Sequence, residues 1–159
     1  MKKSAIIIDI DGTLTRDPLL IDDKSRDGRD IFYQKIDNYL RVKKELIKPV
    51  VDLVKHLFYS TVQVTFLFLT AREDKYEIRK NTLEFLREEI FYIDDDSLYM
   101  REENDLQPNY KVKEQILKEQ ILPNYDVLFA LDDEDKNVEM FRKNGILVLQ
   151  VKDVANNNR

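Results

Sequence analysis

The chain has 159 residues, no cysteine and a formal net charge of −5. This length fits one domain that can bury a core without covalent staples, and the lack of cysteine excludes disulfides, thiol catalysis and thiolate metal sites. We therefore expect a cytoplasmic protein, and the acidic balance argues against broad, non-specific binding to duplex nucleic acid. The first apolar run ends at Asp9, too soon for a signal-peptide core or a membrane span.

Scarce glycine and histidine exclude further classes of active site. Three glycines cannot form a Walker-type phosphate loop or a dinucleotide-binding fingerprint. His56 is the single histidine, which excludes Ser-His-Asp catalysis and histidine-based zinc sites. Its helical neighbourhood predicts a surface or partly packed side chain.

Short apolar runs alternate with segments of helical spacing. Strands are predicted at residues 4–8, 62–69, 98–101, 127–131 and 146–151. Helices are predicted at 48–59, 74–91, 110–122 and 134–144, with Pro123 and Gly145 as stops after the last two. This alternation predicts an α/β fold, a doubly wound parallel sheet with helices on both faces.

A polar segment at residues 16–45 interrupts the alternation. We expect a small flap there, although a plain solvated loop fits its charged composition equally well. Residues 1–152 are predicted to form one domain and 153–159 a flexible tail. The acidic run 94–96 is predicted to be a solvated turn.

The first predicted strand ends in Asp9-Ile10-Asp11-Gly12-Thr13, which places two carboxylates and a turn at one point. In open parallel sheets, ligands bind at the carboxyl ends of the strands, and the strand period of two puts both carboxylates on one side. Taken alone, such a sequence is an ordinary turn.

Three more polar signals follow in order. Thr70-Ala71-Arg72 follows the second strand, Lys113 opens a helical segment, and Asp132-Asp133 follows the fourth strand. Each has a structural explanation as a helix cap or an exposed lysine. Their order after Asp9 favours a catalytic interpretation.

This set of motifs resembles the haloacid-dehalogenase (HAD) superfamily of phosphotransferases, whose signature is DxDGT, then Ser or Thr, then Lys, then an acidic pair. More narrowly, the chain resembles the phosphatase domain of phage-type polynucleotide kinases, which removes 3′-phosphates from nucleic acid ends. The narrower likeness runs from Ala5 to Val151 and is densest after Leu98. It departs at Asn109, where that family often has an acidic residue, and the family's additional arginine is left open among Arg16, Arg26 and Arg29.

The resemblance implies a Rossmann-like HAD fold and a role for each group. Asp9 attacks phosphorus to form an aspartyl-phosphate, and Asp11 acts as general acid and base. Thr70 and Lys113 contact and neutralise the phosphoryl oxygens. Expected substrate contacts come from Thr13, Ala71, Arg72 and Arg101.

Mg²⁺ is the expected cofactor, because that ion prefers hard oxygen ligands. The predicted ligands are Asp9, Asp11 through its carbonyl, Asp132 and Asp133, with Asp133 acting through water or orienting Lys113. The expected partners are phosphorylated nucleic acid 3′ ends and a separate kinase or ligase, with no membrane.

Two alternatives stay open at this point. The same chemistry could act on nucleotides or other small phosphomonoesters. A non-enzymatic receiver domain shares the sheet and the acidic cluster, but it has its acidic pair after the first strand, whereas this chain has the pair last.

Overall fold

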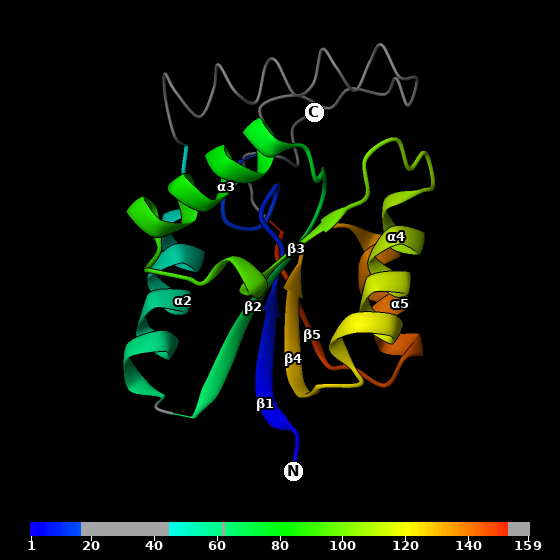
Figure 1. Cartoon of the computed structure of the whole chain (residues 1–159). Coiled ribbons are helices and arrows are strands. Elements are labelled where there is room, and N and C mark those ends of the chain that lie inside the picture. Colours follow the sequence, from blue (N-terminus) through cyan, green and yellow to red (C-terminus); the bar gives the residue numbers. More distant parts are fainter. Residues whose placement is uncertain (17–44, 62, 153–159) are drawn as a thin grey trace.

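The computed structural model describes residues 1–16, 45–61 and 63–152. Five parallel strands form one sheet in the order β3-β2-β1-β4-β5, so that β1 is central and the chain winds outward in both directions (Figure 1). The strands are β1 (Lys3–Ile8), β2 (Val64–Glu73), β3 (Leu98–Arg101), β4 (Tyr125–Asp132) and β5 (Val148–Gln150). This is the predicted doubly wound α/β fold.

Helices cover both faces of the sheet (Figure 1). They are α2 (Lys48–Ser60), α3 (Tyr76–Glu89), α4 (Asn109–Ile116) and α5 (Asp135–Lys143). A π-helical turn at Leu117–Ile121 extends α4 toward the predicted stop at Pro123, and a 3₁₀ turn at Asp95–Ser97 occupies the acidic run.

Alternate residues of β1 supply two separate hydrophobic clusters, because successive side chains of a strand point to opposite faces. Ile6 and Ile8 pack in the cluster that includes buried residues of α2 and α3. Ala5 and Ile7 pack in the cluster that includes buried residues of α4 and α5. Burial on both faces holds β1 rigidly, and its carboxyl end is therefore a fixed support for Asp9.

Strand β2 is longer than predicted. It continues beyond Leu69 to Glu73, which pairs with Arg101 of β3 after an irregularity in the register. The predicted strand ended where the apolar run ends, at Leu69, yet Arg72 and Glu73 beyond it are both buried. As a result Thr70 lies inside a strand and is not the N-cap of a helix.

Three further predictions concern His56, the segments outside the described residues, and membrane-spanning helices. His56 is exposed on α2, as expected. The predicted flap at 16–45 and the tail at 153–159 lie almost wholly outside the described residues. Across the parts of the chain that the structure describes, none of the helices is both long and apolar enough to cross a membrane.

Candidate active site

A tight turn carries the chain away from β1 and sets the direction of the acidic residues. The Ile10 carbonyl accepts the backbone N–H groups of Thr13, Leu14 and Thr15. Gly12 adopts φ +85°, and a Cβ atom there would collide with the Asp133 carboxylate. Glycine is therefore needed for both the backbone conformation and the close approach of β1 to β4.

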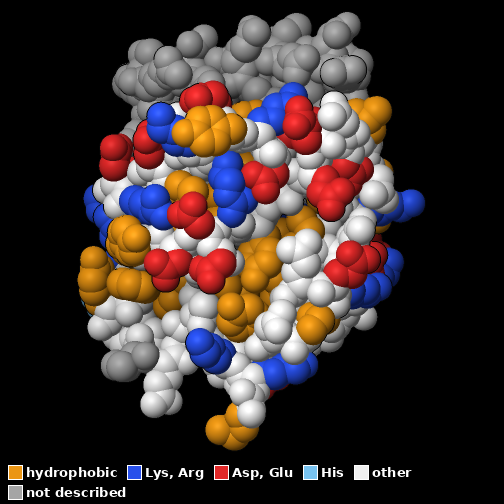
Figure 2. All heavy atoms as spheres, viewed as in Figure 1, with side chains coloured by type: hydrophobic (Ala, Val, Ile, Leu, Met, Phe, Trp, Pro, Cys, Tyr) orange, Lys and Arg blue, Asp and Glu red, His pale blue; other side chains and the backbone are white. Residues whose placement is uncertain are grey.

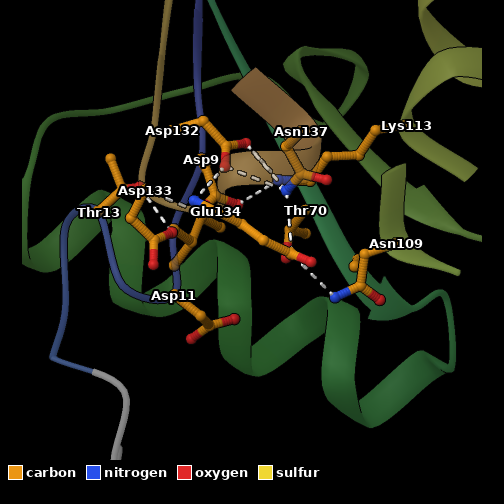
Figure 3. A network of polar contacts seen from close by, with 12 residues as sticks. Asp9, Asp11, Thr13, Thr70, Asn109, Lys113, Asp132, Asp133, Glu134 and Asn137 are labelled. Carbon is orange, nitrogen blue, oxygen red and sulfur yellow. Dashed lines mark hydrogen bonds and ion pairs between the residues drawn. The ribbon is translucent and has the colours of Figure 1, made fainter. Parts of the chain in front are cut away.

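Three carboxylates meet at the ends of β1 and β4 (Figure 3). One oxygen from each of Asp9, Asp132 and Asp133 can be chosen so that all lie within 4.8 Å of one another. Lys113 reaches into the group from α4, and its Nζ donates to Asp9 Oδ1 and Asp132 Oδ2, each at 2.7 Å. Lys113 is buried, so it is not an ordinary exposed helix lysine.

Burial and the neighbouring charges shift the pKa values of three side chains in this cluster. Burial raises the pKa of Asp9 well above its usual value; Lys113 opposes the shift, and the neighbouring acidic pair adds to it. Burial, with repulsion from Asp132, raises the pKa of Asp133 to about 6. Burial would lower the pKa of Lys113, but attraction to Asp132 and Asp9 outweighs it and raises that pKa.

The charges and donor atoms of the cluster fit a divalent cation. Three carboxylates face one ammonium group, which leaves excess negative charge, and a bound Mg²⁺ would neutralise it with hard oxygen ligands. The residues that would hold the ion are Asp9, Asp132 and Asp133. The predicted fourth ligand, the Asp11 carbonyl, stays a prediction.

Asp11 lies apart from the three clustered carboxylates. Its carboxylate accepts from Arg72 twice, from Nε at 2.8 Å and from Nη2 at 2.6 Å, in a bidentate ion pair. Arg72 also donates to Thr82 Oγ1 at 2.9 Å. The Arg72 guanidinium, predicted to contact phosphate, thus holds the Asp11 side chain in this structure.

Two threonine side chains also lie in the site, Thr13 from the turn after β1 and Thr70 from β2. Thr13 Oγ1 donates to Asp9 Oδ2 at 3.0 Å and lies 3.4 Å from Asp133 Oδ1. Thr70 Oγ1 accepts the backbone N–H of Arg72 at 3.2 Å. Both side chains are buried, and Figure 3 shows them among the labelled residues of the site.

Arg101, which was predicted to contact substrate, lies buried in the structure. It is only 2 % exposed, and its guanidinium donates to the carbonyls of Ala71, Asp105 and Gln107 and to Asn109 Oδ1. Two of these carbonyls belong to the loop before α4, and the third belongs to β2. This geometry favours a structural role for Arg101 over direct contact with substrate. The Ala71 carbonyl, at another predicted substrate contact, is one of the acceptors of the Arg101 guanidinium.

Sequence reasoning missed Asn137, which lies on α5 and is buried. Its Nδ2 donates to both carboxylate oxygens of Asp132, at 3.0 and 3.3 Å. The available signal was an amide residue in the first turns of the helix that follows the acidic pair. Polar residues at that place in the chain are common, so the signal is weak without the structure.

A family model for the polynucleotide kinase PNKP phosphatase domain matches residues 3–155. The chain belongs to this family. It is a phosphatase of the HAD superfamily, as the motifs predicted, and the receiver-domain alternative is wrong.

Solved structures agree with this assignment. Two structures of the Pnkp1/Rnl/Hen1 complex, one described as an RNA repair complex, contain chains with TM-scores of 0.68 and 0.70 and 27% identity. Each match covers 94% of this chain but only 46% or 42% of the other, so this chain spans less than half the length of those proteins. The class C acid phosphatase from Bacillus anthracis shares the fold at 16% identity and TM-score 0.53, over 86% of this chain and 53% of that one.

Proposed function

We propose that this domain is a Mg²⁺-dependent phosphomonoesterase that removes 3′-phosphates from nucleic acid ends through an aspartyl-phosphate intermediate. One observation carries the proposal. The two carboxylates of the DxDGT motif have different surroundings: Asp9 lies with Lys113 and the acidic pair, and Asp11 is held apart by Arg72. Separate environments suit a nucleophile and an acid–base group.

Asp9 is the nucleophile in this proposal. Its carboxylate oxygen bonds to phosphorus while the bond from phosphorus to the leaving oxygen breaks, which gives an aspartyl-phosphate and a free hydroxyl. Lys113 neutralises charge beside the attacking carboxylate, and Thr13 orients that carboxylate through its hydrogen bond. A bound Mg²⁺ would supply further charge neutralisation for the phosphoryl oxygens.

Asp11 moves the proton. It gives a proton to the leaving oxygen in the first step and takes one from the water that attacks phosphorus in the second, which regenerates Asp9 and releases phosphate. Arg72 fixes the direction of the Asp11 carboxylate through two hydrogen bonds. In this proposal Thr70, from the neighbouring strand β2, donates its hydroxyl to a phosphoryl oxygen.

The choice of substrate rests on the relatives. The matching family is the phosphatase part of a polynucleotide kinase, and structurally similar chains occur in a complex described as an RNA repair complex. We infer that this chain acts on nucleic acid ends and works with a kinase or ligase carried by another part of the protein or by a partner.

The decisive experiment compares substrates under identical conditions. Purified protein with Mg²⁺ is assayed for phosphate release from matched 3′- and 5′-phosphorylated oligonucleotides, from mononucleotides and from a small aryl phosphate. We expect the highest kcat/KM for the 3′-phosphorylated oligonucleotide and no release after chelation. Asp9→Asn is expected to abolish release from every substrate with unchanged circular dichroism.

Each contrary result has a distinct meaning. A preference for a mononucleotide or another small phosphomonoester would reject the nucleic acid substrate and keep the chemistry. Full activity after exhaustive chelation would reject the metal, and near-normal turnover by Asp9→Asn would reject the covalent intermediate.

A further inference from the structure

A chain of hydrogen-bonded polar side chains, two of them buried, one partly buried and one exposed, runs beside the active site, and the proposed mechanism does not use it. It consists of Arg101, Asn109, Glu134 and Asn137, and we call it the polar chain. Figure 3 shows three of its members, Asn109, Glu134 and Asn137, next to the acidic residues. Its two ends contact different parts of the site.

One end holds the exit of β2. Arg101 Nε donates to the Ala71 carbonyl at 2.9 Å, immediately after Thr70. Its Nη1 donates to two carbonyls of the loop before α4, and its Nη2 donates to Asn109 Oδ1 at 2.7 Å. Arg101 is therefore a buried junction of β2, β3 and the start of α4.

The other end holds the acidic cluster. Asn137 Nδ2 donates to both oxygens of Asp132 and lies 3.3 Å from Glu134 Oε2. The Asp132 Oδ1 atom also accepts the backbone N–H of Glu134 at 3.1 Å. Glu134 and Asn137 together restrict the direction in which the Asp132 carboxylate points.

Asn109 joins the two ends. Its Oδ1 accepts from Arg101, and its Nδ2 donates to Glu134 Oε2 at 3.3 Å. An amide is both donor and acceptor, whereas a carboxylate accepts only. An aspartate at this position could still accept from Arg101, but it would place negative charge against Glu134.

We propose that Asn109 is a positioning residue for the metal-binding carboxylate Asp132, acting through Glu134 and Asn137. The inference rests on the proposed function, because it takes Asp132 as a ligand of Mg²⁺. Residues that orient a metal ligand commonly change metal affinity by about 10–100-fold when they are removed. Asn109 acts through two intervening side chains, so we expect the low end of that range.

The test is an exchange of donor and acceptor. Asn109→Asp removes the amide that donates to Glu134 and so breaks this hydrogen bond. Glu134→Gln alone keeps a side-chain oxygen that can accept from Asn109. In the double variant the new glutamine amide can donate to the new aspartate, which restores a hydrogen bond in the opposite direction. Asn124→Asp is the matched control, because it adds the same charge at an exposed position whose Nδ2 bonds only to the Gln120 carbonyl. Asn109→Ala, which removes both hydrogen bonds without adding charge, replaces Asn109→Asp should that variant not fold.

The first readout is the rise in Tm on titration with MgCl₂, which needs no turnover and gives an apparent Mg²⁺ affinity. We expect Asn109→Asp to weaken this affinity by about tenfold. Glu134→Gln alone and Asn124→Asp should stay close to wild type. Added to Asn109→Asp, the second substitution Glu134→Gln should recover most of the lost Mg²⁺ affinity. Added to Asn109→Ala, it should recover none.

The second readout is turnover of a small aryl phosphate. At subsaturating Mg²⁺, we expect Asn109→Asp to lower kcat with KM changed less than about twofold, since the substrate contacts are intact. Excess Mg²⁺ should restore kcat.

The outcomes separate this inference from the proposed function. Equal Mg²⁺ affinities in all variants, tighter binding by Asn109→Asp, or no recovery in the double variant would overturn the role of Asn109 and leave the proposed function in place. The expected affinity pattern in a protein without phosphatase activity would support the role of Asn109 and contradict the proposed function. A wild-type protein that neither binds Mg²⁺ nor releases phosphate would overturn both.

Discussion

Asp9 and Asp11 are two residues apart on one strand end, yet their partners come from different elements. Asp9 is buried beside Lys113 of α4 and the acidic pair at the end of β4, and Asp11 is a partly exposed partner of Arg72 on β2. In the proposed mechanism, this difference in surroundings lets two identical side chains perform different chemistry.

Substitution of Asp11 should therefore affect proton transfer and leave metal binding unchanged. We expect Asp11→Asn to lower kcat for a small aryl phosphate by a factor on the order of 10² or more, because the general acid is lost. The Mg²⁺ concentration for half-maximal activity should not change, since the Asp11 carboxylate is outside the acidic cluster. Asp52→Asn, at an exposed ion pair with Lys48, is the matched control. A defect confined to Mg²⁺ affinity would instead make Asp11 a metal ligand.

Asp133 makes the stability of the metal-free protein depend on pH. Its pKa is raised from 3.8 to about 6 in the folded state, so its contribution to stability is complete below about pH 4 and is lost as the pH rises through 6. In the presence of a chelator, the free energy of unfolding of wild type should fall relative to that of Asp133→Asn as the pH rises from about 4 to just above 6. Urea denaturation of the two proteins across this range measures the difference. A constant difference would show that Asp133 has the same pKa in the folded and unfolded states.

Element ends decide where the site residues point. Gly12 lies within the turn after β1, with φ +85°, against the Asp133 carboxylate. Gly145 follows α5 with φ +77°, and in the described structure no atom lies within 4 Å of the position that its Cβ atom would take. The same backbone conformation therefore has different surroundings at the two glycines. Extension of β2 to Glu73 likewise places Arg72 beside Asp11.

The two glycines provide a matched pair of substitutions. Gly145→Ala should cost about 1 kcal/mol of stability, from the left-handed backbone alone, and should leave turnover unchanged. Gly12→Ala should lower Tm further and reduce turnover strongly, because the new Cβ would displace the Asp133 carboxylate. Thermal unfolding and aryl phosphate turnover of both variants measure the two effects. Equal losses in both variants would show that the contact with Asp133 has no consequence.

At the scale of the whole molecule, the charge balance does not favour a broad basic surface for nucleic acid. The net charge is −5, and on the face shown in Figure 2 acidic and basic side chains are interspersed. If the proposed function is right, we expect an oligonucleotide to bind through a few local contacts to the phosphates next to the 3′ end. Such contacts release few counterions.

This arrangement predicts a modest dependence on salt that is limited to the polymer. For a single strand with two contacted phosphates, kcat/KM should fall by about sevenfold from 50 to 200 mM salt, from a slope of about 0.7 per contact. Hydrolysis of a small aryl phosphate should change much less, because it has no flanking phosphates. Parallel assays of the two substrates across this range measure the effect, and identical salt profiles would contradict a nucleic acid substrate.

The order of strands and helices and the position of Asp9 and Asp132 at strand ends could be predicted from the sequence alone. Hydrophobic periodicity and turn residues are local signals, and in a parallel sheet they are enough to bring the carboxyl ends of the strands together. The motif order likewise predicted a HAD phosphatase, which the family match confirmed.

The partners of individual polar side chains were decided only by the tertiary structure. Arg72 binds Asp11 from 61 residues away, Arg101 is buried among main-chain carbonyls, and Asn137 holds Asp132 from the following helix. A charged side chain has the same sequence signature whether it faces water, substrate or a buried carboxylate. Its direction is set by the packing of elements distant in sequence, because a buried polar group must find the partners that the surrounding fold supplies.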